Sequence, residues 1–386
     1  MTTTEQGPTA VTERALGPDL ARGFMLLFIA LANSHYFLRG SSVLGGFPQD
    51  GSAIDRAVTW LIATFVDGRA FPMFGLLFGY GVAQIVRRQT GTAWATRFLL
   101  WRRSAVLVVL GFLHAMLLYV GDILAAYGVL LFFGVWAIRW KDRWLFVVAF
   151  LVLALTALPS DTSLSISTDA PDVSMLPPDL RTQFSERILV SPVIALLGPI
   201  GFLPPFLIGV WAGRRRILER PAEHLRLLKA TAVVGISIAV LGAQPVALTL
   251  SRVIDQPTGD TLSLVGPLHD ASGTLGGFGY AALIVLIATR IRRGRVTEAI
   301  AATGQRSLSC YLMQSVVWTV VFTPYLLDLS DTLTVATTAL LATVAWTVTV
   351  VLADRMRAAG YRGPFELLIR RITYRTGVSR RPSVRQ

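Results

Sequence analysis

The sequence is poor in charge, cysteine and histidine. Only 15% of its 386 residues are charged, compared with about 25% in a typical soluble domain. The single cysteine, Cys310, excludes a disulfide framework and a thiolate metal site, and we expect no bound metal. The sequence has no Walker loop, dinucleotide fingerprint, zinc-protease helix or Gly-x-Ser-x-Gly elbow. These features argue against a soluble catalytic domain of a common type.

Hydrophobic residues are abundant and make up 53% of the chain. They fall in blocks of about 20 residues, which is the length that crosses a hydrocarbon layer of ~30 Å as a helix. We therefore predict an all-α, polytopic membrane bundle of about ten transmembrane helices. The predicted spans cover residues 19–38, 70–86, 105–120, 123–138, 144–158, 191–211, 228–250, 264–287, 308–325 and 333–352.

The net charge of +13 comes from basic residues that lie in short clusters between the apolar blocks. This placement favours membrane topology over nucleic-acid binding, because basic residues concentrate in cytoplasmic loops. An arrangement with both termini in the cytoplasm leaves only six of the 36 basic residues outside. We therefore predict a multi-pass protein of the cytoplasmic (plasma) membrane, with no nucleic-acid partner.

The spans divide into two five-helix halves at residues 18–159 and 190–354. A polar segment at 160–189, rich in Asp, Ser and Pro, is expected to form a loop on the outer face. A cytoplasmic tail at 1–17 precedes the first half, and a basic cytoplasmic tail at 355–386 follows the second.

Two shorter segments are also expected to be helical. Residues 361–374 mix apolar and basic side chains, which is typical of an amphipathic helix on an anionic membrane surface. Residues 53–66 are apolar but are interrupted by Asp55 and Arg56. They predict a short helix on the outer surface or a re-entrant helix.

Ionisable side chains inside membrane spans are costly, so each is a candidate functional residue. His114 lies near the outer end of the third span, and Asp122 lies in the tight turn into the fourth. An imidazole that is oriented by a carboxylate can act as a general base or as a nucleophile. We therefore predict His114 and Asp122 as catalytic residues. A hydrogen bond from His114 to a neighbouring helix is the structural alternative.

The first span carries four further candidates. Asp19 and Arg22 have the i, i+3 spacing of an ion pair close to the inner interface, either as part of a binding site or as a simple helix-start pair. Asn33 and His35 lie toward its outer end. Asn33 is a candidate substrate-binding residue. His35 is a second catalytic candidate, with helix-to-helix hydrogen bonding as the alternative.

Polar residues in three other spans complete the candidate set. Arg69, at the outer entrance of the second span, would suit a carboxylate, a phosphate or a developing oxyanion. Tyr311 and Gln314 share one face of the ninth span, which either lines a pocket or bonds adjacent helices. His269 and Asp270 open the eighth span, where we interpret them as a solvated helix start.

Several runs together resemble the bacterial DUF418 membrane proteins, also called the YeiB family. They are DLARGF at 19–24, FGLLFGYG at 74–81, the run from RRSAV to YGVL at 102–130, TGQRSLSCYLMQS at 303–315, and YRGPFELLIRRITY at 361–374. Asp19, Arg22, Asn33, His114, Gly121 and Asp122 fall on family-typical positions. His35 and the Ser309-Cys310 pair depart from the family pattern.

That family is similar to membrane acyltransferases of the acyltransferase-3 and heparan-glucosaminide acetyltransferase groups. The resemblance implies transfer of an acyl group from a cytoplasmic acyl-CoA, such as acetyl-CoA, to a small-molecule, sugar or natural-product acceptor. It implies no tightly bound cofactor. The expected partners are the lipid bilayer and the acceptor, and homodimerisation is left open. The alternative functions are a transporter or exporter of a small molecule or lipid, and a non-catalytic membrane protein.

Overall fold

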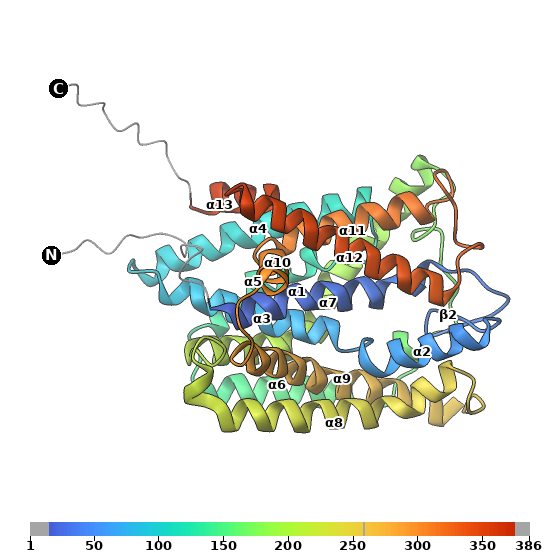
Figure 1. The fold of residues 1–386 in the computed structure, drawn as a ribbon, viewed down its shortest axis with the longest axis horizontal. Helices are drawn as coiled ribbons and strands as arrows, with labels where there is room; N and C mark the ends of the chain where they lie inside the picture. Colours follow the sequence, from blue (N-terminus) through green and yellow to red (C-terminus); the bar gives the residue numbers. More distant parts are fainter. Residues whose placement is uncertain (1–14, 258, 375–386) are drawn as a thin grey trace.

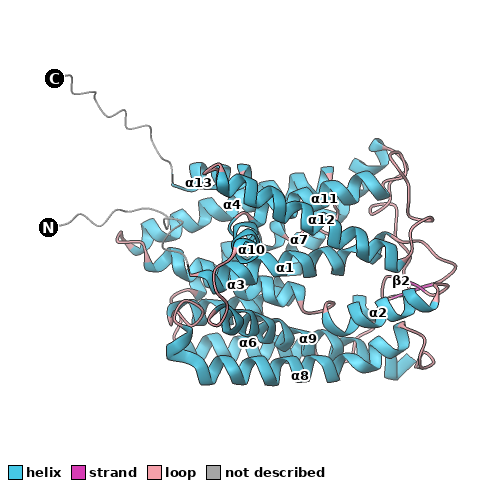
Figure 2. Ribbon diagram, viewed as in Figure 1, coloured by secondary structure: helices cyan, strands magenta, loops and turns pink. Residues whose placement is uncertain are grey.

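Long helices dominate the structure, as the apolar blocks of the sequence predict. The computed structural model describes residues 15–257 and 259–374. Most of its helices lie side by side along the long axis (Figure 1), and loops connect them at the two ends (Figure 2). The predicted tails extend beyond the described part of the chain, since residues 1–14 and 375–386 lie outside it. The prediction of an all-α bundle is confirmed.

Each predicted span corresponds to one helix. In chain order these are α1 (Leu16–Ser34), α3 (Ala70–Arg87), α4 (Ala93–Leu117), α5 (Leu124–Ala137), α6 (Asp142–Thr156), α7 (Leu180–Arg214), α8 (Leu225–Leu250), α9 (Gly259–Ala288), α11 (Ser307–Phe322) and α12 (Val335–Ala358).

Seven stretches of the described chain are long and apolar enough to cross a membrane, and α5 and α11 are shorter apolar helices. Large apolar side chains are exposed along the bundle surface, for example Phe150 on α6 at 70% and Leu241 on α8 at 72%. Extended apolar surface of this kind indicates contact with lipid. The count of ten spans and the orientation stay predictions.

The remaining elements are short. They comprise α2 (Ala53–Phe65), α10 (Arg295–Gln305), α13 (Pro364–Tyr374), the 3-10 turns η2 (His35–Phe37), η3 (Leu164–Ile166) and η4 (Pro221–His224), and the strands β1 (Val43–Leu44) and β2 (Phe47–Pro48). The helices expected near 53–66 and 361–374 are present as α2 and α13. The strands form one antiparallel hairpin, with Leu44 opposite Phe47. Gly45 and Gly46 make its two-residue turn with positive φ angles of 57° and 80°.

Three boundaries differ from the sequence prediction. The expected loop at 160–189 ends early, because α7 already begins at Leu180 and continues through four internal prolines. Helix α12 extends to Ala358, beyond the predicted end of the second half at 354. Helix α10 lies in a connection for which no helix was predicted, because its eleven residues include too few apolar positions to indicate a span.

The two halves of the chain pack into one bundle. Helix α3 packs along α7, and α1 contacts α3 as well as α9, α10, α11 and α12. The contact between α3 and α7 is close because both helices carry glycine there. A Cβ on Gly79 would clash with the carbonyl oxygen of Phe206, and a Cβ on Gly209 would clash with that of Leu76. Glycine at these positions therefore lets α3 and α7 approach closely.

Candidate functional site

The structure brings His114 and Asp122 together. His114 lies in the last turn of α4, and Asp122 lies in the turn that leads into α5. The distance from His114 Nδ1 to Asp122 Oδ1 is 2.8 Å, and both side chains are almost fully buried. The other carboxylate oxygen accepts a hydrogen bond of 2.7 Å from the backbone N–H of Ala125. Because a carboxylate accepts, this network places the imidazole proton on Nδ1 and leaves the lone pair on Nε2.

A second set of buried polar atoms lies on α11. The ring of Tyr311 is 5.1 Å from that of His114, measured between centroids. The hydroxyl of Tyr311, both amide atoms of Gln314 and Nε2 of His114 are buried without a hydrogen-bond partner in the described structure. Unpaired buried polar atoms are rare in folded proteins and commonly mark a site that water or a ligand fills. The predicted polar face of the ninth span therefore looks into the bundle.

A cavity of about 680 Å³ reaches Tyr311 from the end of the bundle where α13 lies. Its walls come from α1, α3, α4, α5, α10, α11 and α13. This volume falls within the range of known small-molecule pockets, about 300–1,000 Å³. We call it the basic cavity, because its lining includes seven arginines and only three acidic residues. These are Arg22, Arg88, Arg103, Arg220, Arg306, Arg362 and Arg370, with Asp19, Glu219 and Glu366.

The acidic residues of the basic cavity are already bound to other groups. Asp19 pairs with Arg22 at 3.2 Å, and Glu219 pairs with Arg87 at 2.8 Å. Glu366 accepts from two backbone N–H groups at the start of α11. Four of the lining arginines form no ion pair or side-chain hydrogen bond with any described residue, namely Arg88, Arg103, Arg362 and Arg370. The cavity therefore carries positive charge that suits an anionic ligand.

The other candidates of the first span are divided between two places. Asp19 and Arg22 line the basic cavity, and Asp19 also accepts a hydrogen bond of 2.9 Å from Gln305. Asn33 accepts a bond of 3.3 Å from the hydroxyl of Tyr119, whose ring lies beside His114. His35 lies elsewhere: its ring stacks on Phe47 of the hairpin at 3.8 Å.

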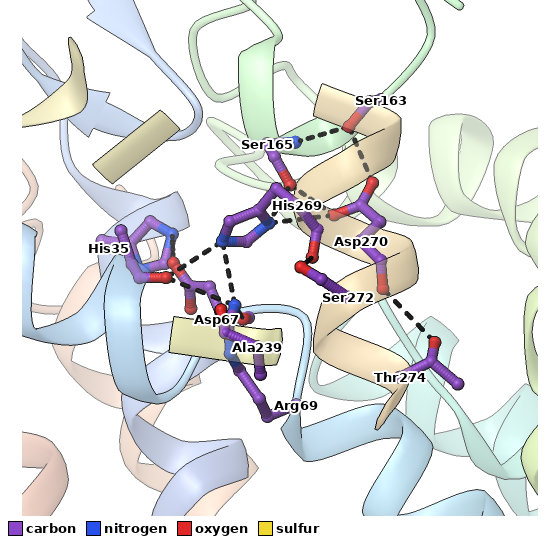
Figure 3. Close-up of polar contacts among 11 residues, drawn as sticks. His35, Asp67, Arg69, Ser163, Ser165, Ala239, His269, Asp270, Ser272 and Thr274 are labelled. Atoms are coloured by element: carbon purple, nitrogen blue, oxygen red, sulfur yellow. Dashed lines mark hydrogen bonds and ion pairs between the residues drawn. The ribbon is translucent and has the colours of Figure 1, made fainter. Parts of the chain in front are cut away.

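His35 and Arg69 belong to a second group of buried residues at the hairpin end of the bundle. We call His35, Asp67, Arg69, His269 and Asp270 the hairpin cluster (Figure 3). Helix α3 separates the cluster from the basic cavity, since it begins beside Arg69 and ends at Arg87. At 1.5 Å per residue, its 18 residues span about 27 Å.

The two terminal nitrogens of the Arg69 guanidinium have partners within the hairpin cluster. Its guanidinium donates to the backbone oxygens of Ala63, Asp67 and Ala239 and lies 3.0 Å from Nε2 of His269. Figure 3 shows His269 between Arg69 and Asp270. The terminal nitrogens of Arg69 thus already have partners at the hairpin end, and its role as a substrate-binding residue stays a prediction.

His269 and Asp270 do not form a helix start. They lie ten residues inside α9, which begins at Gly259, and His269 is only 1% exposed. Asp270 accepts hydrogen bonds from Ser163 at 2.7 Å and Ser165 at 2.5 Å. It thereby ties the segment around η3 to α9.

Sequence reasoning did not single out Asp67 or the unpaired arginines as site residues. Asp67 stands in a polar turn, and its histidine neighbour, His35, is 32 positions earlier in the chain. The arginines belong to clusters that topology alone explains. Three of the four, Arg88, Arg103 and Arg370, stand in Arg-Arg pairs. Their common cavity follows only from the packing of seven helices.

The fold and the site define a helical, multi-pass membrane protein with a buried polar pocket. Residues 212–376 match the family described as "Protein of unknown function (DUF418)". The chain is 26% identical to "Uncharacterized protein YxaH" of Bacillus subtilis (strain 168), over 95% of this chain and 96% of the relative. It is 27% identical to "Uncharacterized protein YeiB" of Escherichia coli (strain K12), over 80% and 84%. These matches support the resemblance to the DUF418 proteins.

Proposed function

We propose that this protein is a membrane-embedded acyltransferase. It would take an acyl group from an anionic donor of the acyl-CoA type in the basic cavity and pass it to a small-molecule, sugar or natural-product acceptor. The observation that carries the proposal is the pairing of His114 with Asp122, which leaves a buried Nε2 without a partner. Tyr311 links this base to the cavity, because it lines the cavity and contacts His114.

The proposed reaction is a single acyl transfer with His114 as general base. Nε2 takes the proton from an acceptor O–H or N–H group while the acceptor atom attacks the thioester carbonyl. The hydroxyl of Tyr311 and the side-chain amide of Gln314 donate hydrogen bonds to the developing oxyanion. The C–S bond then breaks, and the proton on His114 passes to the departing CoA thiolate. Asp122 stabilises the imidazolium that exists between these two proton transfers.

The unpaired arginines support an anionic donor. A CoA thioester carries several phosphate charges, and guanidinium groups bind phosphate oxygens with two parallel hydrogen bonds. Replacing Arg103 with glutamine removes one such contact, so we expect at least a tenfold weaker affinity. Arg290→Gln is the matched control, because Arg290 is exposed and does not line the cavity.

A transporter of an anionic molecule is the second candidate function. It is favoured by one observation, namely that buried polar groups occur at both ends of α1 and α3, in the basic cavity and in the hairpin cluster. Intramembrane ionisable groups commonly mark substrate pathways. This function predicts movement of the ligand across proteoliposomes without any covalent change.

The test uses purified protein in detergent with acetyl-CoA, longer acyl-CoAs and free CoA. We expect an acyl-CoA to raise the thermal unfolding midpoint, and we expect CoA release in the presence of an acceptor. His114→Ala should keep the binding shift and lose the release. Binding without release in both proteins, together with uptake in proteoliposomes, would favour the transporter. Absence of binding by every CoA species would refute the proposal.

A further inference from the structure

Aromatic side chains form a continuous patch across the start of α4 and the end of α5. The ring of Trp101 lies 5.6 Å from that of Trp94 on the same helix, measured between centroids. It lies 6.0 Å from the ring of Phe132 and 5.8 Å from that of Trp136, both on α5. The ring of Phe133 packs edge-on against Phe132 at 5.3 Å. We call these five residues the aromatic patch.

The aromatic patch faces outward from the bundle. Trp94 is 63% exposed, Phe133 is 62% exposed, and Phe132 and Trp136 are 45% and 43% exposed. Leaving such large apolar rings in water is costly, and tryptophan is enriched where hydrocarbon meets the lipid headgroups. In the predicted orientation, α4 starts and α5 ends at the cytoplasmic face. This orientation places the patch in the interface of the inner leaflet.

Arg97 stands between the two tryptophans of α4. It follows Trp94 by three residues and precedes Trp101 by four, and these spacings place the three side chains on one face of the helix. Its Nε is buried and has no hydrogen-bond partner in the described structure. A guanidinium can only donate, and a buried donor without an acceptor is unfavourable. Arg97 therefore offers a hydrogen bond to a ligand oxygen within the patch.

The surroundings of Arg97 carry positive charge. Asp122 is the only acidic residue in the sequence between the start of α4 and the end of α5, and it lies at the opposite end of both helices. Asp142, at the start of α6, is already paired with two arginines at the end of α7. Arg139 and Lys141 follow α5. The cytoplasmic leaflet carries anionic lipids, whose headgroups a basic region of this kind attracts.

We propose that the aromatic patch and Arg97 form a binding site for one anionic phospholipid of the inner leaflet. The headgroup phosphate accepts hydrogen bonds from the guanidinium of Arg97, and Trp94 and Trp136 flank the headgroup. Phe132 and Phe133 lie about one turn deeper on α5 than Trp136, so their rings contact the acyl chains.

The lipid site is separate from the basic cavity. Neither Arg97 nor any residue of the aromatic patch lines that cavity, whose wall on α4 comes from Arg103 and Leu107. The proposal therefore does not depend on acyl transfer. A lipid is favoured over a soluble phosphate, because Arg97 lies among side chains that face lipid and a phosphate reaches it together with its acyl chains.

Thermal unfolding of the purified protein in a non-ionic detergent tests the proposal. Added phosphatidylglycerol is compared with phosphatidylcholine of the same chains, whose choline cation would face the basic region, and with soluble glycerol phosphate. We expect phosphatidylglycerol to raise the unfolding midpoint at the lowest concentration and glycerol phosphate to have no effect. In Arg97→Gln, a half-maximal shift should need about tenfold more phosphatidylglycerol. Arg290→Gln, which removes an exposed arginine outside the patch, should respond like the wild type.

A second variant, Trp94→Ala, separates the two parts of the site. It keeps the charge of Arg97 and removes an exposed ring. Binding of both lipids should therefore weaken, while the preference for phosphatidylglycerol remains. If Arg97→Gln does not fold, this variant tests the site in its place.

Three outcomes would overturn the assignment. The first is an equal response of the wild type to phosphatidylglycerol and phosphatidylcholine. The second is a response of Arg97→Gln, or of Trp94→Ala in its place, that equals that of the wild type. The third is a dimer that Trp94→Ala dissociates and lipid does not, because a second copy of the chain would then cover the patch.

Discussion

Replacing Asp122 with asparagine should separate the structural and chemical roles of this carboxylate. One oxygen accepts from the backbone N–H of Ala125 and the other from Nδ1 of His114. Asparagine has a single oxygen, and a backbone N–H cannot become an acceptor, so that oxygen remains with Ala125. The amide NH2 group then faces Nδ1, which must accept. The imidazole proton consequently moves to Nε2, where it blocks the general base.

The magnitudes follow from the bonds that are exchanged. A charge-assisted hydrogen bond, worth about 1.5–3 kcal/mol, is replaced by a neutral one worth about 0.5–1.5 kcal/mol. We therefore expect the free energy of unfolding to fall by about 1 kcal/mol. The proposed transfer rate should fall far more, by about 10²–10⁴, which is the usual contribution of a general base. A small loss of stability with a large loss of rate is the signature of a displaced proton.

Asp179→Asn is the matched control for this prediction. Asp179 also accepts from a backbone N–H three residues ahead, that of Thr182 at 2.8 Å, but it is exposed and has no histidine partner. Both variants are compared by unfolding in mixed micelles and by acyl-CoA-dependent CoA release. A transfer rate in Asp122→Asn equal to that of the control would refute the role assigned to Asp122.

Two further predictions concern packing and pH. A Cβ on Gly111 would clash with the backbone nitrogen of Ala125 and with the Asp122 carboxylate, so Gly111→Ala should lower the unfolding free energy by about 1–3 kcal/mol. Gly201→Ala serves as its control, because a Cβ on Gly201 in α7 meets open space and should not destabilise the protein. The guanidinium groups of Arg215 and Arg214, at the C-terminal end of α7, hold the pKa of Asp142 below its ordinary value. These ion pairs stabilise the protein above about pH 4 and are lost as the pH falls. Asp142→Asn should therefore cost up to about 1 kcal/mol at pH 7 and less at pH 3, and an equal cost at both pH values would contradict the ion-pair account.

The sequence was most informative where the relevant residues are close in the chain. His114 and Asp122 are eight positions apart around one tight turn, so their contact could be predicted from helix length alone. The apolar blocks likewise predicted every long helix, because about 20 apolar residues in a row have few other stable arrangements. In both cases the controlling physics is local.

Residues that meet through tertiary packing were not predictable in the same way. For Arg69 the sequence predicted a group suited to a carboxylate, a phosphate or an oxyanion, but not the residues that surround it. The structure places it against α8 and α9, where Ala239 and His269 bind its guanidinium. Which helices become neighbours depends on close approaches such as that of Gly79 to Phe206, and a single sequence does not reveal such pairs.

Helix α1 connects the two polar regions of the molecule. Asp19 and Arg22, near its first turn, line the basic cavity, and His35 follows its last residue. If the two regions are coupled through α1, a substitution at His35 changes the affinity of a ligand in the basic cavity, and the ratio of the two dissociation constants gives the coupling free energy. An unchanged dissociation constant would show that α1 connects the two regions without coupling them.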